Sequence, residues 1–241
     1  MAIPAVRLKY LESDNFAPGG GIGTVNNTSV TAKVENIAFV KDVALRFAGF
    51  DGWREQPLTF QDGFGDYDLF SYSGSDFSTT RFAIRYTVQG VTFWDNNGGF
   101  DYRVDESRPN TVGGNVVLGK AVARRGTQAG GGFVFATSWV EGEILVKNLS
   151  FNKLVGIRLT TNGWTSFIDT AALFNHKQAV AVGLSQVEVW TFKTPELNLD
   201  PSSDHFEFAV FYENRDSGER LWDNNFGQDY TLSKQDQASD G

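Results

Sequence analysis

The fold is decided by a stretch that the chain spells twice, "KVENIAFVKDVALRF" (Lys33–Phe47) and "LVKNLSFNKLVGIRL" (Leu145–Leu159). In the first copy Val43, Leu45 and Phe47 alternate with Arg46, and in the second copy Ile157 alternates with Arg158 in the same way. A period of two with one apolar face predicts half-buried strands of an antiparallel sheet.

Further landmarks repeat in the same order along the chain. A Gly-Trp pair follows each copy, then "RFAIRY" or "EFAVFY", then "FWDNNGGFDY" (Phe93–Tyr102) or "LWDNNFGQDY" (Leu221–Tyr230). Upstream, an apolar run precedes a glycine triplet in both halves, Gly19–Gly21 and Gly130–Gly132. Because the spacing changes only between landmarks, insertions fall in loops, as two copies of one fold require.

The repeat predicts the domain organisation. We expect one β-sandwich at 1–105, a polar Pro- and Gly-containing linker at 106–113, a second sandwich at 114–234 and a disordered tail at 235–241. Helical periodicity is weak, and "DTAALFNHKQAV" (Asp169–Val180) is the one helix candidate.

Composition restricts the classes of partner and chemistry. The 241 residues carry a net charge of -8 and show no Lys/Arg cluster, which disfavours nucleic acids and anionic membranes and favours a neutral ligand. The chain has no cysteine, which excludes disulfides, thiol catalysis and Cys-ligated zinc. The first ten residues lack the apolar core of a signal peptide.

Catalytic motifs are missing from the sequence. His176 and His205 both lie in the second copy, outside any metal-binding spacing, so we expect no catalytic residue, no metal and no cofactor. Paired carboxylates remain an alternative among the 29 Asp and Glu, since glycoside hydrolysis needs only two. Duplication of a whole small domain favours binding over catalysis.

The repeated Trp-Asp-Asn-Asn turn offers the chemistry of a sugar site. An indole presents a flat apolar face to the C–H side of a sugar ring, and an amide supplies both donors and an acceptor for hydroxyls. The alternative is a shared turn with a core Trp, because Asn and Asp also favour turns for backbone reasons. The candidates from this turn are Trp94, Asn96, Asn97 and Asp101, and Trp222, Asn224, Asn225 and Asp229.

Other repeated positions extend the candidate list. Trp53 and Trp164 follow glycine in polar turns, where exposure with ligand contact and burial are equally expected. Trp139 and Trp190 lie in strand-like runs and are expected in the core. The matched Lys41 and Lys153 are able to bond hydroxyls, with a solvated lysine as the alternative.

The second copy, through "VKNLSFNKLVGIRLTTNGWTSFIDTAALF", "FEFAVFY" and "LWDNNFGQDY", resembles carbohydrate-binding module family 21, and the first copy carries the same landmarks. The resemblance implies two tandem immunoglobulin-like antiparallel β-sandwiches, an all-β fold that binds α-1,4-glucan without catalysis. It places the main site on Trp53, Trp94, Trp164 and Trp222 and on the lysines Lys41 and Lys153. An aromatic found there in some members is alanine here, at Ala83 and Ala209. It implies a second site at Phe39, Asn148, Phe151 and Phe174.

The function expected from this resemblance is binding of starch, amylose or glycogen by two modules, with avidity from the pair. A fused catalytic domain outside this sequence is a possible partner. Secretion is favoured for a module of an amylolytic protein, and the cytoplasm for a glycogen-targeting one. Alternatives are β-glucan specificity, such as β-1,3-glucan, and a phosphatase adaptor, although "RVDE" (Arg103–Glu106) lacks the aromatic of its docking motif.

Overall fold

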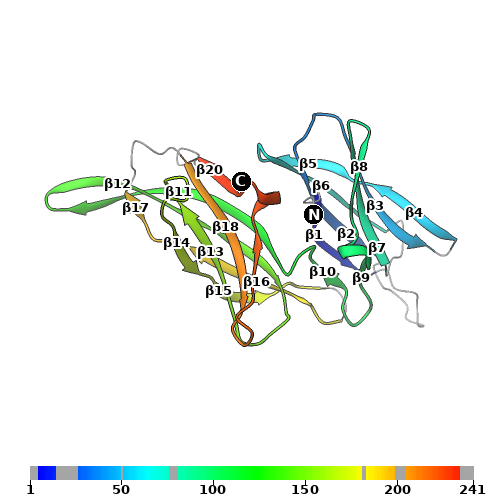
Figure 1. Cartoon of the computed structure of the whole chain (residues 1–241). Helices are drawn as coiled ribbons and strands as arrows, with labels where there is room; N and C mark the ends of the chain where they lie inside the picture. Colours follow the sequence, from blue (N-terminus) through cyan, green and yellow to red (C-terminus); the bar gives the residue numbers. More distant parts are fainter. Residues whose placement is uncertain are drawn as a thin grey trace. The chain divides into compact units, whose positions relative to one another are not determined.

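The computed structural model describes residues 5–14, 27–49, 51–75, 81–180, 183–198 and 205–233 (Figure 1). The chain forms two compact units, Met1–Gly114 with Lys177–Val187, and Asn115–His176 with Glu188–Gly241. Within the described ranges no helix is long and apolar enough to cross a bilayer, and no group of three or more His, Cys, Asp or Glu residues is arranged to hold a metal ion.

The first unit consists of two antiparallel sheets. One has the order β10-β1-β2-β6-β5 and the other β4-β3-β7-β8, with β9 also paired to β7. The strands are β1 (Val6–Ser13), β2 (Thr28–Glu35), β3 (Lys41–Gly49), β4 (Gly52–Pro57), β5 (Thr59–Gly63), β6 (Tyr67–Gly74), β7 (Arg81–Val88), β8 (Val91–Asp95), β9 (Tyr102–Arg103) and β10 (Asn110–Thr111), with a short 3₁₀ turn η1 (Asn97–Gly99).

The second unit repeats the strand orders β1-β2-β6-β5 and β4-β3-β7-β8 of the first unit. One sheet has the order β11-β12-β16-β15, with β17 paired to β12, and the other β14-β13-β18-β19, with β20 paired to β18. Its elements are β11 (Val116–Gly130), β12 (Phe133–Lys147), β13 (Lys153–Thr160), β14 (Ile168–Ala171), β15 (Leu173–Lys177), β16 (Val187–Lys193), β17 (Leu197–Asn198), β18 (His205–Asn214), β19 (Arg220–Asp223), η2 (Asn225–Gly227) and β20 (Tyr230–Ser233). The prediction of an all-β fold built from two antiparallel sandwiches is confirmed.

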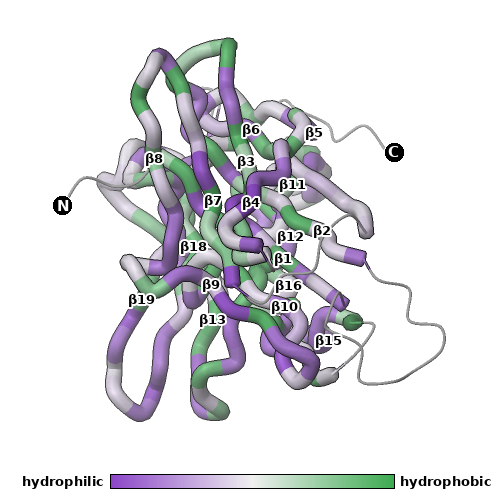
Figure 2. The backbone as a smooth tube through the Cα atoms, turned by 90° about the vertical axis from the view of Figure 1, so that its right-hand side faces the viewer, coloured by the Kyte–Doolittle hydropathy of each residue, from purple (hydrophilic) through white to green (hydrophobic). Residues whose placement is uncertain are grey.

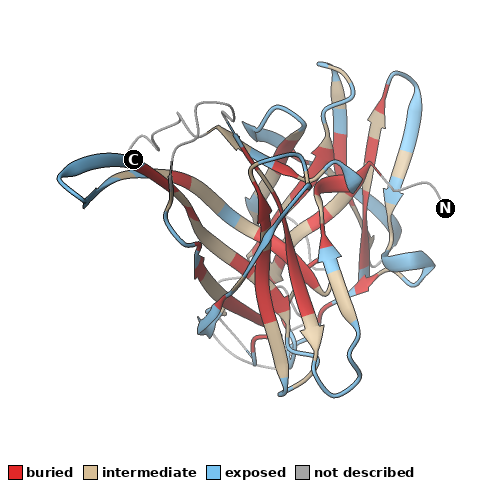
Figure 3. Cartoon of the chain, turned by 60° about the vertical axis from the view of Figure 1, so that its left-hand side comes forward, coloured by how far each residue is buried: buried red, intermediate tan, exposed pale blue. Residues whose placement is uncertain are grey.

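Alternation along the strands builds each core. Val43, Leu45 and Phe47 of β3 are all buried, while Arg46 between them stays on the outer face. Strands therefore mix hydrophobic and hydrophilic residues (Figure 2), and buried residues lie mainly along the strands, whereas many loops and hairpin ends are exposed (Figure 3). Each buried aliphatic or aromatic side chain contributes about 1.5–3 kcal/mol to folding. Tyr86 is fully buried, and its hydroxyl donates to the Glu35 carbonyl at 2.9 Å.

Two expectations from the sequence are wrong. The helix candidate Asp169–Val180 contains strand β15 and most of β14, because Ile168–Ala171 pairs with Gly156–Leu159 of β13. Trp139 and Trp190 are only half-buried, and each indole N–H donates at 3.0 Å to a glutamate on the same face of its strand, Glu141 and Glu188 respectively.

Part of the predicted linker 106–113 forms strand β10 and pairs with β1. Asn110 is 2% exposed, and Leu11 of β1 pairs with Thr111. The Asn110 amide also donates to the Ser185 hydroxyl at 2.9 Å, within the segment 177–187 that belongs to the first unit. The domain boundaries themselves stay a prediction, and the tail 235–241 and Gly19–Gly21 lie outside the described residues.

Candidate functional site

The repeated turn is anchored by a covered carboxylate. In the first unit Asp95 ends β8 and accepts from the Leu8 backbone N–H at 2.6 Å and from the Tyr102 hydroxyl at 2.8 Å. Burial raises the pKa of Asp95, and these two donors oppose that rise. Burial likewise raises the pKa of Tyr102. The carboxylate thus ties the turn to strand β1.

The second unit repeats this anchor. Asp223 is 2% exposed and accepts from the Leu118 N–H at 2.9 Å and from the Tyr230 hydroxyl at 2.7 Å. The first Asp and the Tyr of each motif, Asp95 with Tyr102 and Asp223 with Tyr230, are therefore structural, which explains their fixed separation.

The paired asparagines of the turn do different work. Asn97 and Asn225 adopt positive φ, and their amides donate to the carbonyls of Asp101 and Asp229 at 3.1 and 3.0 Å. Asn225 is 1% exposed, so it holds the turn from inside. Asn96, in contrast, uses only its amide oxygen, which accepts from the Gly99 N–H at 3.0 Å.

In the first unit the structure brings four predicted residues together. Trp53 on β4, Trp94 on β8, and Asn96 and Asp101 of the turn line one open pocket of about 280 Å³. The two tryptophans are 42% and 37% exposed. The pocket lies on the outer face of the sheet β4-β3-β7-β8, where Ala83 and Arg46 complete its lining.

Arg46 lies against both rings of this pocket. Its guanidinium carbon is 5.6 Å from the centroid of Trp53 and 5.4 Å from that of Trp94. Arg81 stands 5.3 Å from the Trp53 centroid and forms an ion pair with Asp101 at 2.7 Å. Sequence alternation placed Arg46 on the solvent face but did not indicate its contact with the two indoles.

The second unit places the equivalent residues on its sheet β14-β13-β18-β19. Trp222 of β19 is 37% exposed, and the Arg158 guanidinium lies 5.1 Å from its ring centroid. Trp164 is half-buried in the turn after β13 with a φ of 63°, and it hydrogen-bonds the Asp229 carboxylate. Burial raises the pKa of Asp229, the nearby Glu207 charge adds to the rise, and the Trp164 bond opposes it.

The predicted lysines bond to partners other than the repeated tryptophans, and neither lines the pocket of Trp53 and Trp94. The side chain of Lys41 is 4% exposed, with an ion pair to Asp68 at 2.6 Å and a bond to Asn36 at 2.8 Å. Lys153 is equally covered, and pairs with Glu188 at 2.9 Å and with Asn148 at 3.1 Å. Both lysines and Asn148 therefore brace the loop before a central strand.

That loop carries the most exposed aromatics. Phe39 and Phe151 are fully exposed, at 98% and 103%. Phe174, which is 51% exposed, packs edge-on against Trp190 with centroids 5.7 Å apart. The first unit has an unpredicted counterpart in Phe60, which is 61% exposed and lies edge-on to Phe70 at 5.9 Å. Its position on short β5 gave no repeat signal.

A larger pocket, about 620 Å³, lies in the second unit on strands β11, β12 and β16, with Ala171 of β14 and Leu173 of β15, and no predicted site residue lines it. Its charges are already paired, Lys120 with Glu143 at 3.0 Å and Arg124 with Glu141 at 2.9 Å. The candidate site is therefore the smaller pocket, where two exposed indoles, the Asn96 amide and the Asp101 carboxylate converge.

The chain is similar in sequence to a family of known proteins. The profile of the family described as "Carbohydrate/starch-binding module (family 21)" matches residues 24–105 and 133–233. Protein phosphatase 1 regulatory subunit 3C of Bos taurus is 33% identical over 93 residues, and glucoamylase 1 of Rhizopus oryzae is 33% identical over 86 residues. These alignments cover 39% and 33% of this chain, but only 28% and 14% of the two relatives.

A solved structure is also similar, the starch-binding domain of Rhizopus oryzae glucoamylase in complex with β-cyclodextrin and maltoheptaose. It is 24% identical with a TM-score of 0.35, and the match covers 42% of this chain and 93% of that domain.

Proposed function

Because the chain belongs to the carbohydrate/starch-binding module family 21, we propose that it binds α-1,4-glucan, as starch, amylose or glycogen, through two non-catalytic modules. The observation that carries this proposal is the convergence of Trp53, Trp94, Asn96 and Asp101 on one open pocket. The related glucoamylase fits an amylolytic setting outside the cell, whereas the related glycogen-binding subunit 76A of Drosophila melanogaster fits a glycogen-targeting role inside it.

The chemistry of the pocket suits a sugar chain. Two exposed indoles offer apolar faces for the C–H sides of sugar rings, and the small Ala83 leaves the floor between them open. Because Asn96 uses only its amide oxygen in the turn, its two N–H donors remain for hydroxyls. We assign Asn224 the same role, since its side chain does not cap the following turn.

The exposed phenylalanines supply the second surface in this proposal. Phe39 and Phe151 would stack on a sugar ring without adding a hydroxyl, and Phe174 extends that surface in the second unit. Lys41, Lys153 and Asn148 act by holding the loop that presents these rings. Several weak sites on one chain raise avidity for a repetitive polymer by about 10²–10⁴.

The test compares retention in affinity gels that contain amylose. We expect Trp94→Ala and Trp222→Ala each to weaken retention by about tenfold, as loss of a stacking ring worth about 1.5 kcal/mol requires, and the double variant to lose it. Phe133→Ala is the matched control, since Phe133 is 70% exposed but lies on the β11–β12 hairpin and is not a residue of the proposed sites. Undiminished retention of the folded double variant would refute the proposal.

The same gels separate the alternatives. Stronger retention on laminarin or cellulose than on amylose or glycogen would assign the pair to β-glucan. Release of reducing sugar from soluble starch would show an enzyme instead of a binding module. Capture of a phosphatase catalytic subunit by the full chain would support the adaptor function.

A further inference from the structure

The arginines of the two sites have different partners. Arg46 of β3 stands opposite Glu55 of β4 and Ala83 of β7 in the sheet register. Glu55, however, bonds Arg85 at 3.0 and 3.2 Å. Among the described residues Arg46 therefore has no ion pair and no hydrogen bond, and its neighbours are the two indole rings.

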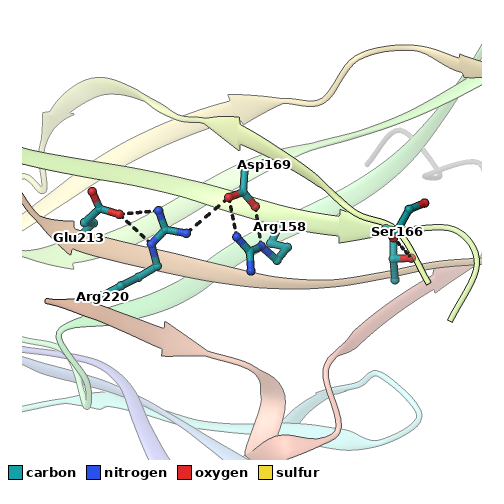
Figure 4. A network of polar contacts seen from close by, with 6 residues as sticks. Arg158, Ser166, Asp169, Glu213 and Arg220 are labelled. Carbon is teal, nitrogen blue, oxygen red and sulfur yellow. Dashed lines mark hydrogen bonds and ion pairs between the residues drawn. The ribbon is translucent and has the colours of Figure 1, made fainter. Parts of the chain in front are cut away.

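In the second unit the equivalent arginine is fully engaged. Arg158 stands opposite Asp169 and Ala209 in the same register. Its guanidinium donates two bonds to Asp169, at 2.6 and 2.7 Å, and Asp169 also pairs with Arg220, which binds Glu213 (Figure 4). The second unit has no arginine equivalent to Arg85, which competes with Arg46 for Glu55 in the first unit. Arg85 pairs with Trp94, and the residue that pairs with Trp222 in the same way is Phe211 of β18.

The rims of the two sites also differ in charge. Beside Trp53 the first site has Arg81, and the half-exposed Arg81 covers the Asp101 carboxylate. At the corresponding position of β18 the second site has Glu207, whose charge acts on Asp229. An anionic ligand would therefore lie near Arg81 in the first site, but near the carboxylates of Glu207 and Asp229 in the second site.

A guanidinium held against aromatic rings keeps its planar edge of N–H donors, and that edge matches the oxygens of phosphate or carboxylate. A phosphate monoester carries about 1.5–2 negative charges at neutral pH and is attached to a glucose hydroxyl without altering the α-1,4 backbone. Carboxylates near the first site do not preclude it, because Asp101 is paired with Arg81, and Glu55 with Arg85.

We propose that the first site is selective for an α-glucan chain that carries a phosphate monoester, with the phosphate oxygens bound by Arg46 while sugar rings stack on Trp53 and Trp94, and that the second site takes the neutral chain. This inference rests on the proposed glucan-binding function and adds a ligand class to one of its sites. Arg46 is the residue that determines the specificity.

The test measures retention of the full chain in gels that contain phosphorylated amylose or the same polymer after phosphatase treatment. Because a hydrogen bond to a charged group contributes about 1.5–3 kcal/mol, we expect at least about tenfold stronger retention on the phosphorylated polymer at low salt. Half-molar salt should reduce this ratio, since it screens exposed charges.

Two matched variants assign the preference to one site. Arg46→Gln should abolish the ratio, and Arg46→Lys, which keeps the charge but loses the fork, should retain part of it. Arg158→Gln should leave the ratio intact, because Arg158 is already bound to Asp169. Thermal unfolding of each variant confirms that it is folded.

Equal retention of the unmodified chain on both polymers overturns this inference but leaves glucan binding in place. Loss of the ratio in Arg158→Gln, or its survival in Arg46→Gln, also overturns it. Failure to bind either polymer refutes the proposed function and this inference together.

Discussion

The two units carry the same sandwich and the same pair of tryptophans, yet their outer sheet faces differ in electrostatics. In the first unit Arg85 forms the ion pair with Glu55, and Arg46 lies against the indole rings instead. In the second, Phe211 replaces Arg85, and Asp169 holds Arg158. A single cross-strand neighbour therefore decides whether the arginine beside the aromatic platform has free donors, and duplication preserved the scaffold while the charges diverged.

The anchors of the repeated turn are the features that the units share most closely, so breaking one should have the largest effect. Asp223→Ala removes the acceptor of the buried Leu118 N–H and one acceptor of the Tyr230 hydroxyl. At about 1–3 kcal/mol for the unsatisfied buried N–H and about 1 kcal/mol for the lost hydroxyl bond, we expect a loss of about 3 kcal/mol, measured by thermal or denaturant unfolding. The control Asp223→Asn keeps an acceptor and should lose less. Equal stability of Asp223→Ala and the unmodified chain would show that the carboxylate is no anchor.

The next effect concerns one turn position that differs between the units. Phe226 has a φ of 61° and is 6% exposed, whereas the first unit has Gly98 there with a φ of 69°. Phe226→Gly relieves left-handed strain of about 1–2 kcal/mol but removes a buried ring worth about 3–5 kcal/mol. We therefore expect a net destabilisation of about 2 kcal/mol in denaturant unfolding.

A change at the equivalent position of the first unit measures the backbone strain alone. Gly98→Ala meets open space, since nothing lies within 4 Å of the added Cβ, so it should cost only the strain of about 1 kcal/mol. A stabilising Phe226→Gly would mean that strain outweighs burial at this turn.

The smallest effect is the pH dependence of the second-unit ion pair. Hydrogen bonding to Arg158 lowers the pKa of Asp169 below its ordinary value of 3.8. A lowered folded pKa contributes stability above the unfolded pKa, and that contribution is lost as the pH falls through the folded value. Asp169→Asn should therefore lower stability by at most ~1 kcal/mol at pH 7, and the difference in melting temperature should vanish in strong acid.

Asp51→Asn is the control for this measurement, because the pair of Asp51 with Arg54 has both side chains more than half exposed. It should change stability at neither pH. A difference for Asp169→Asn that persists unchanged in strong acid would contradict the assignment of the pKa shift to the ion pair.

The sequence alone determined the strand class, the duplication and most residues of the candidate site. Alternation of period two fixed which face of β3 and β13 is buried, because a strand has only two faces, and the repeat located Trp53, Trp94 and Asn96 before their convergence was known. It misassigned Trp190 and the segment Asp169–Val180, because a propensity pattern does not include the partners that a strand meets across a sheet.

Only the tertiary structure decided which side chains of the repeated Trp-Asp-Asn-Asn motif stabilise the turn and which face solvent. Asn96 and Asn97 look alike in the sequence, but backbone φ turns the Asn97 amide onto the Asp101 carbonyl. The partners of Arg46 and Arg158 were likewise hidden, because an ion pair depends on the register between strands that lie far apart in the chain. Local pattern sets the faces of a strand, and cross-strand geometry sets the neighbours that give each face its chemistry.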